Sequence, residues 1–333
     1  MNRDKSAKPS GEVAASILKN IVKDQRLLLL ILIVVIAIVV GSVNPRFLEI
    51  KNIITILQQV SVLGLITLGI AMLMLSGGLD LSVGNIMIMS GCTIAVLINR
   101  NLGNPVIVPV AVALGIAIAT AAGMLNGFII AKSRCMPLII SLGMSGIYYG
   151  IALLISGGDY MSFKLAFEPL RALRLAGIVP INTIIFLCMV LVCYVLVNRS
   201  KYGRRIVAIG GNEQAAWLSG IKVDIYKITT YAISGLLCGI ASILYASRLD
   251  SITAGSGAGY ELNALTASII GGVTFDGGKG SVLGAFLGVI FMGLVANAMN
   301  VLSIPSPFQT VISGAIVVVA VIISNIDHLR KKR

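Results

Sequence analysis

Two carboxylic acids stand beside apolar segments of this chain, Asp80 in the run LDLS and Glu261 in the run YELN. An ionisable group among apolar residues is a candidate for contact with a substrate or an ion, because holding it there is energetically costly. Each acid also precedes a short helix-compatible segment, where a carboxylate can accept backbone amide hydrogen bonds and oppose the positive helix end. The sequence alone leaves both roles open.

Neutral polar side chains lie within the same apolar segments. Asparagine amides there could bind a neutral polyhydroxylated solute, or they could hydrogen-bond neighbouring helices to one another. Both readings remain open for each residue taken singly. The predicted lining of a translocation path is Asp80, Ser82, Asn85, Ser90, Asn126, Glu261, Asn263, Asn297 and Asn300.

A hydrolytic serine is not supported. The run GMSG at 143–146 fits the G-x-S-G pattern of intramembrane serine proteases, but the reaction needs a base beside Ser145. The only histidine, His328, is in the terminal tail, so no Ser-His pair is available within the apolar segments.

A nucleotide site is also not encoded. The run GGKGS at 277–281 resembles part of a phosphate-binding loop, but Val273 and Gly280 stand where that motif requires glycine and Ser or Thr. If ATP drives this protein, the ATPase must be a separate chain.

Metal and disulfide chemistry receive no support from the cysteines. None of the five has C-x-x-C spacing, and each lies in or beside an apolar segment. We therefore expect no cofactor, no metal site and no disulfide framework. The cysteines are Cys92, Cys135, Cys188, Cys193 and Cys238.

The composition places these residues in a membrane protein. Hydrophobic residues make up 57% of the chain and charged residues only 12%, so lipid must solvate most of it. Charge-free apolar segments predict an all-α polytopic fold of about ten transmembrane helices, the two short segments 85–98 and 262–275 being marginal in length. The eight longer segments are 27–43, 53–75, 105–131, 137–156, 181–197, 228–247, 281–302 and 308–325.

Positive charge orients the predicted helices. With ten spans and a cytoplasmic amino terminus, 19 of the 26 basic residues lie inside and seven outside, which favours cytoplasmic positions for both termini. The net charge of +13 is thereby assigned to membrane orientation rather than to a nucleic-acid partner. We predict a cytoplasmic segment over 1–26, whose residues 11–26 form either a short interfacial helix or a solvated tail, and a basic cytoplasmic tail over 327–333.

The permease domain predicted over 27–326 contains two similar halves, repeat one at about 27–156 and repeat two at about 181–326. The halves share, in order, an acid-Leu pair, a G-x-x-x-G motif and a proline-initiated last helix. Five spans per half require opposite orientations in the membrane, which is the inverted-repeat plan of many transporters. The short segments 85–98 and 262–275 occupy matching places and point to a central path. The glycine motifs indicate either that path or close helix packing.

The longest predicted cytoplasmic loop, 199–227, has the features of a docking surface for another protein. It begins with a basic strand-like approach, and a short helix follows over Glu213–Ser219, with Asn212 as its cap and Gly220 as its terminator. An interfacial helix anchored by tryptophan is the alternative. The residues predicted to couple to a partner are Gly211, Asn212, Glu213, Ala215, Ala216, Trp217, Ser219 and Gly220.

Several longer runs resemble the permease subunits of bacterial ATP-binding-cassette importers for ribose and related monosaccharides. The resemblance extends from about Asn44 to Ile326. Its most specific runs are IITILQQVSV at 53–62, SGGLDLSVG at 76–84, GRRIVAIGGNEQAAWLSGIKV at 203–223, AGYELNALTASIIGG at 258–272 and GGKGSVLGAFLG at 277–288.

That resemblance implies the fold of the vitamin B12 importer permease, assembled as a homodimer in the bacterial cytoplasmic (inner) membrane. It implies two further partners, an extracytoplasmic sugar-binding protein and a tandem ATPase on the cytoplasmic side. The AAWLSG segment resembles the coupling helix, with the Ala215-Ala216-x-x-x-Gly220 spacing of such importers. The outer loop from Gly157 to Pro180 departs most from ribose permeases, so the particular sugar stays open.

We therefore expect a monosaccharide permease of the ribose type with no chemistry of its own. An ion-coupled secondary transporter that uses Asp80 and Glu261 is the alternative, and a passive channel is a third hypothesis.

Overall fold

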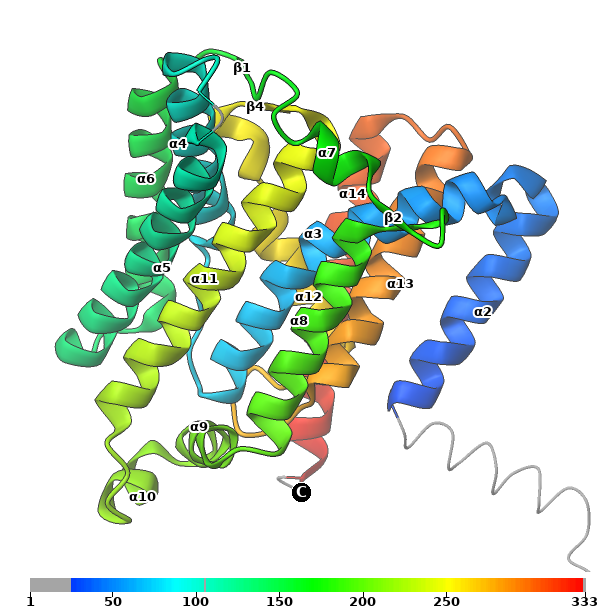
Figure 1. The fold of residues 1–333 in the computed structure, drawn as a ribbon. Coiled ribbons are helices and arrows are strands. Elements are labelled where there is room, and N and C mark those ends of the chain that lie inside the picture. The colour runs from blue at the N-terminus through cyan, green and yellow to red at the C-terminus, as the bar shows by residue number, and fades with distance from the viewer. Residues whose placement is uncertain (1–24, 105, 332–333) are drawn as a thin grey trace, which may run out of the picture.

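The computed structural model describes residues 25–104 and 106–331, with side chains described for 26–104 and 106–322. The predicted segment 1–26 and its interfacial helix lie outside the described residues, apart from positions 25 and 26. Within the described ranges the chain is a bundle of helices (Figure 1). The helices are α2 (Gln25–Val43), α3 (Ile50–Leu75), α4 (Val83–Arg100), α5 (Ile107–Ser133), α6 (Pro137–Ser156), α7 (Glu168–Ala172), α8 (Ile181–Asn198), α9 (Lys201–Gly211), α10 (Glu213–Leu218), α11 (Val223–Leu249), α12 (Tyr260–Ile270), α13 (Val282–Val301) and α14 (Ser306–Lys331), with 3-10 turns η1 (Pro45–Leu48) and η2 (Ala254–Gly257).

Eight of the described helices are long and apolar enough to cross a membrane, namely α2, α3, α4, α5, α6, α8, α11 and α13. Side chains on the outside of the bundle are apolar as well, with Leu154 86%, Val311 69% and Ile38 64% exposed. An apolar exterior is stable only where lipid is the solvent. The structure therefore confirms an all-α polytopic membrane protein.

The two short predicted spans have different lengths in the structure. The segment 85–98 lies within α4, which has 18 residues and is long enough to cross a membrane, so the span predicted there is confirmed and is longer than expected. The helix continues through Asn99, whose side-chain amide donates to the backbone carbonyls of Ala95 and Ser162, both at 2.8 Å. The second segment forms only the 11-residue helix α12, after which the chain turns through 271–281.

The bundle has two distinct ends (Figure 1). The start of α2, the end of α14 and the helices α9 and α10 lie at one end. At the other end short strands fasten the loops, where β1 (Met161–Ser162) pairs with β4 (Ser251–Ile252), and β2 (Arg174–Leu175) pairs with β3 (Val179–Pro180), both antiparallel. The long connection between α6 and α8 is thus tied to the segment that follows α11.

Helix α3 passes through the centre, and nearly every residue from Val60 to Leu75 is buried. It packs against α8, α11, α12 and α13, and α11 packs along α5. Small residues permit these close contacts. A Cβ added at Gly123 of α5 would lie 2.3 Å from the Tyr231 carbonyl oxygen, and one at Gly288 of α13 would lie 1.9 Å from that of Ala267. The G-x-x-x-G motifs are helix-packing positions.

The close approach of α5 to α11 can be tested with Gly123→Ala. The added methyl group meets a backbone oxygen that cannot move without separating the helices, so we expect a loss of about 1–3 kcal/mol in stability. The measurement is thermal unfolding of the purified protein in detergent. Gly143→Ala is the matched control, because a Cβ there meets nothing within 4 Å. Equal melting temperatures for the two variants would contradict this packing role.

Candidate functional site

The chain turns back on itself between α3 and α4, over residues 76–82. A tyrosine from the second half of the chain hydrogen-bonds the backbone of that turn. The Tyr231 hydroxyl accepts a hydrogen bond from the Leu79 backbone N–H at 3.2 Å and donates one to the Leu79 carbonyl at 2.8 Å. Tyr231 is only 1% exposed, so water cannot replace these bonds. Irregular backbone within a membrane bundle is tolerated where the protein satisfies it in this way.

Asp80 lies at the end of this turn in a fully buried polar cluster. Its Oδ1 accepts hydrogen bonds from the Ser82 N–H at 2.8 Å and from the Ser82 hydroxyl at 2.5 Å. The Asn126 amide donates to Asp80 Oδ2 at 3.1 Å and to the Ser82 hydroxyl oxygen at 2.8 Å. The Tyr148 hydroxyl donates to Asn126 Oδ1 at 2.8 Å. The cluster joins α4, α5 and α6, and its carboxylate orders the start of α4.

A second turn, between α11 and α12, reaches the same level of the bundle. Glu261 Oε1 accepts a hydrogen bond from the Gly259 N–H at 3.2 Å, so this acid also bonds the backbone at the start of a short helix. The starts of α4 and α12 approach one another closely. A Cβ added at Gly84 would lie 2.5 Å from the Gly257 carbonyl oxygen and 2.7 Å from Glu261 Oε2. The two predicted acids therefore lie near the junction of the two halves.

Four of the other predicted path residues bond neighbouring elements. Asn85 donates to the Ser145 hydroxyl oxygen at 2.8 Å, and the Ser90 hydroxyl bonds the Gly115 carbonyl at 2.9 Å and lies 3.1 Å from the Ser242 hydroxyl. Asn297 and Asn300 also form side-chain hydrogen bonds. Their partners are the Asn52 side chain, at 2.8 and 2.9 Å, and the Gln309 amide, at 3.0 Å.

The predicted path residues are thus brought together only in part. Asp80, Ser82 and Asn126 form one cluster. Asn85, Ser90, Asn297 and Asn300 each join a separate pair of helices. Asn263 differs, because its side chain makes no hydrogen bond within the described part of the chain and instead lines a cavity. Whether these residues contact a solute stays a prediction.

Sequence reasoning missed the tyrosines that complete these turns. Tyr148 and Tyr231 lie in apolar segments without any flanking motif, and their partners are 22 and 152 residues away in the chain. The only available signal was a phenol within an apolar span, since a buried hydroxyl needs a hydrogen-bond partner.

The end of the bundle with α9 and α10 differs in one respect from the sequence prediction. The basic approach, predicted to be strand-like, forms helix α9, so that prediction was wrong. Ser200 caps it by accepting from the Gly203 N–H at 3.1 Å, and Ile206 and Ile209 bury one face while Arg204 stays exposed. A helix lying across the bundle end satisfies its own backbone and still buries an apolar stripe.

Helix α10 agrees with its prediction. The Asn212 side chain caps it by accepting from the Ala215 N–H at 2.9 Å, and Gly220 ends it with a φ of 81°. Trp217 and Leu218 are 66% and 72% exposed at this end of the bundle. Two adjacent large apolar side chains in such a place favour contact with another molecule.

Glycines bring α9 close to the end of α3 and to the turn that follows α12. The Gly278 N–H donates to the Leu75 carbonyl at 3.1 Å, so the turn after α12 is bonded to the end of α3. A Cβ added at Gly210 of α9 would lie 2.1 Å from the Leu75 oxygen and 2.6 Å from the Gly278 nitrogen. We call Leu75, Gly77, Gly210, Gly277 and Gly278 the glycine junction. Helix α9 therefore lies in close backbone contact with the end of α3 and with the turn that follows α12.

Side chains also hold α9 and α10 to α11. Glu213 of α10 pairs with Lys227 at 2.6 Å, and Lys227 is mostly buried. The Tyr202 hydroxyl lies 2.7 Å from that of Thr230, and burial raises the pKa of Tyr202, so this phenol stays neutral and able to donate. The described residues contain no group of three His, Cys, Asp or Glu side chains able to hold a metal ion.

These features define a multi-pass membrane protein of the transporter class, with buried polar turns inside and a short helix with exposed apolar side chains at one end. The chain belongs to the family described as the permease component of the branched-chain amino acid transport system, whose model matches residues 52–321. The permease resemblance predicted from the sequence is thereby confirmed.

Individual relatives are import permeases. The ribose import permease protein of Bacillus subtilis is 35% identical over 289 residues, covering 86% of this chain and 88% of the relative. The galactose/methyl galactoside import permease protein of Escherichia coli is 35% identical over 308 residues, covering 87% and 90%. The D-allose transport system permease protein of Escherichia coli is 34% identical, covering 84% and 86%. No solved structure matches the chain significantly.

The role of the Tyr231 hydroxyl can be tested with Tyr231→Phe. Removing it leaves the Leu79 N–H and carbonyl unpaired in a buried turn, which should cost about 1–3 kcal/mol. The measurement is the melting temperature in detergent, together with the protease resistance of residues 76–82. Tyr149→Phe is the control, because Tyr149 is 40% exposed. If both variants melt like the unsubstituted protein, the turn does not depend on this hydroxyl.

Proposed function

We propose that this chain is the permease subunit of an ATP-binding-cassette importer, and that it forms the path by which a ribose-type monosaccharide crosses the bacterial cytoplasmic membrane. The relatives named above are permeases for ribose, galactose and allose and align along most of both chains, which is the observation that carries the proposal. The family description names a component of a transport system, which implies other subunits. The family description therefore favours an importer subunit over an ion-coupled transporter that acts alone.

Ten membrane helices in two inverted repeats, in the manner of the vitamin B12 importer permease, are the proposed fold. To the eight long helices this adds α12 and α14, whose described apolar part runs over Ser306–Ile322. Matching packing supports the repeats. In the first half α4 packs against α5, α6 and α11, and in the second α12 packs against α13, α14 and α3. Repeat one covers about 27–156 and repeat two about 181–326 of a permease domain over 27–326.

The end with α9 and α10 faces the cytoplasm in this proposal, together with both termini. The positive-inside rule supports this orientation, since the loop 199–227 carries six basic residues and the termini carry most of the others on that side. The segments 1–26 and 327–333 are then cytoplasmic.

Helix α10 is the proposed coupling helix, which the tandem ATPase subunit binds. Its exposed Trp217 and Leu218 would enter a groove of that partner, and α9 would pass the movement to the glycine junction. The proposed coupling residues are Gly211, Asn212, Glu213, Ala215, Ala216, Trp217, Ser219 and Gly220, which belong to α10 or border it. We propose no ATPase site in this chain. In the run at 277–281, Gly277 and Gly278 belong to the glycine junction, and Ser281 caps α13 by accepting a hydrogen bond from the Gly284 N–H at 2.9 Å.

A second copy of this chain and an extracytoplasmic sugar-binding protein complete the proposed complex. Two permease subunits enclosing one path match the plan implied by the resemblance. The binding protein would approach the end opposite α10, where β1 and β4 fasten the loops.

The proposed function predicts ATP-dependent uptake of sugar. The permease and its tandem ATPase, reconstituted in vesicles, should accumulate radiolabelled D-ribose, D-galactose or D-allose when the binding protein and ATP are supplied. Omitting the ATPase should abolish uptake. Uptake that persists without it and follows a proton or sodium gradient would contradict the proposal.

The coupling role of α10 can be tested with Asn212→Ala. Loss of the cap should destabilise this short helix by about 1 kcal/mol and lower sugar uptake several-fold, while the chain itself melts as before. Asn212→Asp is the matched control, because its carboxylate can still accept from the Ala215 N–H. Equal uptake by both variants would show that the ordered α10 is not needed for coupling.

A further inference from the structure

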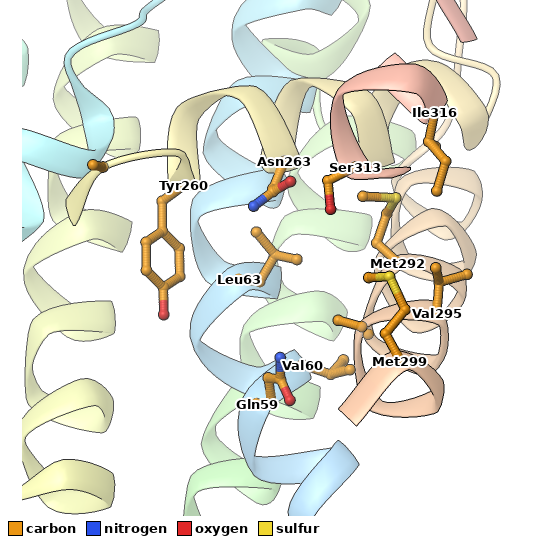
Figure 2. Close-up of a pocket in the computed structure, with 13 residues that line it drawn as sticks. Gln59, Val60, Leu63, Tyr260, Asn263, Met292, Val295, Met299, Ser313 and Ile316 are labelled. Carbon is orange, nitrogen blue, oxygen red and sulfur yellow. The ribbon is translucent and has the colours of Figure 1, made fainter. Parts of the chain in front are cut away.

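A cavity of about 230 Å³ lies between α3, α12, α13 and α14 (Figure 2). Its wall on α13 is apolar and includes Met292 and Met299, whereas Asn263 of α12 and Ser313 of α14 lie near one end and Gln59 of α3 near the other. Gln59 belongs to the third turn of α3, counted from the end opposite α9 and α10. The cavity therefore lies in the half of the bundle away from the proposed ATPase.

The polar side chains that line this cavity form no hydrogen bonds with the described part of the protein. Gln59, Tyr260, Asn263 and Ser313 are each half-buried, and none donates or accepts a side-chain hydrogen bond within the described part of the chain. The asparagines elsewhere in the spans behave differently, since Asn126 and Asn297 are bonded to other side chains. Polar groups at membrane depth normally face partners or a water-filled space. Four such groups around one cavity indicate a polar occupant.

The lining also limits the chemistry of that occupant. No charged side chain lines the cavity among the described residues, so it offers no partner for an ionic solute. Two amides and two hydroxyls can each donate and accept, which suits vicinal hydroxyl groups. The Tyr260 ring and the methionines supply an apolar face. The volume is below the roughly 300–1,000 Å³ of sites for drug-sized ligands, which favours a small molecule.

We propose that this cavity is a transient binding site for the transported monosaccharide, in which Gln59 and Asn263 are specificity-determining residues. The inference rests on the proposed function for the identity of the solute. It adds a site within the permease itself, so that discrimination between sugars is not left entirely to a separate binding protein.

Binding can be tested on the purified full chain without ATP or partners. Cys135 and Cys188 are the exposed cysteines, so the background carries Cys135→Ser and Cys188→Ser, and Ser313→Cys is added. A water-soluble thiol reagent should label this variant. D-ribose, D-galactose or D-allose at about twice the dissociation constant should slow labelling about threefold, because the free fraction falls by that factor. The control keeps Cys135, which is exposed in the connection between α5 and α6, in place of Ser313→Cys, and sugar should not affect its labelling.

Two labelling results would overturn the inference. One is that none of the three sugars, up to the highest concentration tested, slows labelling of the Ser313→Cys variant relative to the rate without sugar. The other is reaction with only lipid-soluble reagents, which would mean that the cavity holds lipid. Either result leaves ATP-dependent uptake measurable, so failure of this inference is distinguishable from failure of the proposed function.

Uptake by the complete transporter supplies the second test. Gln59→Leu removes one hydrogen-bonding group from the cavity and should lower uptake at sub-saturating sugar by about three- to tenfold. Gln58→Leu makes the same chemical change one position earlier, where the side chain does not line the cavity, and should leave uptake unchanged. Equal uptake by the two variants would contradict the site, whereas uptake absent even from the unsubstituted complex would contradict the proposed function.

Discussion

The turn at 76–82, where the backbone leaves regular helix inside the bundle, constrains the packing of the helices around it. Lipid cannot hydrogen-bond a free N–H or carbonyl, so the turn at 76–82 requires a protein partner for each such group. The hydroxyl of Tyr231, from the other half of the chain, bonds both backbone groups of Leu79. Because α11 supplies that hydroxyl, it must lie close to α3, and Gly123 lets α5 approach the Tyr231 backbone.

The buried polar cluster follows from the same constraint. A carboxylate at the start of α4 orders that helix end, but it must itself be surrounded by donors to be tolerated there. Ser82 and Asn126 are those donors, and Tyr148 fixes the orientation of the Asn126 amide. The result joins three helices and leaves Asp80 fully buried. Its geometry fits a structural carboxylate better than an ion-coupling one.

The glycine junction, which adjoins the turn at 76–82, brings α9 against the end of α3 and the turn that follows α12. Backbone atoms of Leu75, Gly210 and Gly278 lie together without intervening side chains, so no Cβ fits at Gly210. Trp217 and Leu218 are exposed at the same end. In contrast, the cavity beside Gln59 and Asn263 lies away from this corner, where side chains rather than backbone define the available space.

The sequence by itself determined the membrane class, nearly all helix positions, the cap of α10 and the family, because hydropathy, charge and capping residues act locally. It also located Asp80 and Glu261 beside the two turns. Only the tertiary structure decided which polar residues are committed, since Asn126 and Asn297 find partners 46 and 245 residues away, whereas Asn263 finds none among the described residues. It likewise turned the predicted strand-like approach into α9, because burial of Ile206 and Ile209 depends on how α3, α8, α10 and α11 pack around this segment. Local pattern specifies what a segment can form, and packing between segments distant in the chain specifies what each side chain is free to bind.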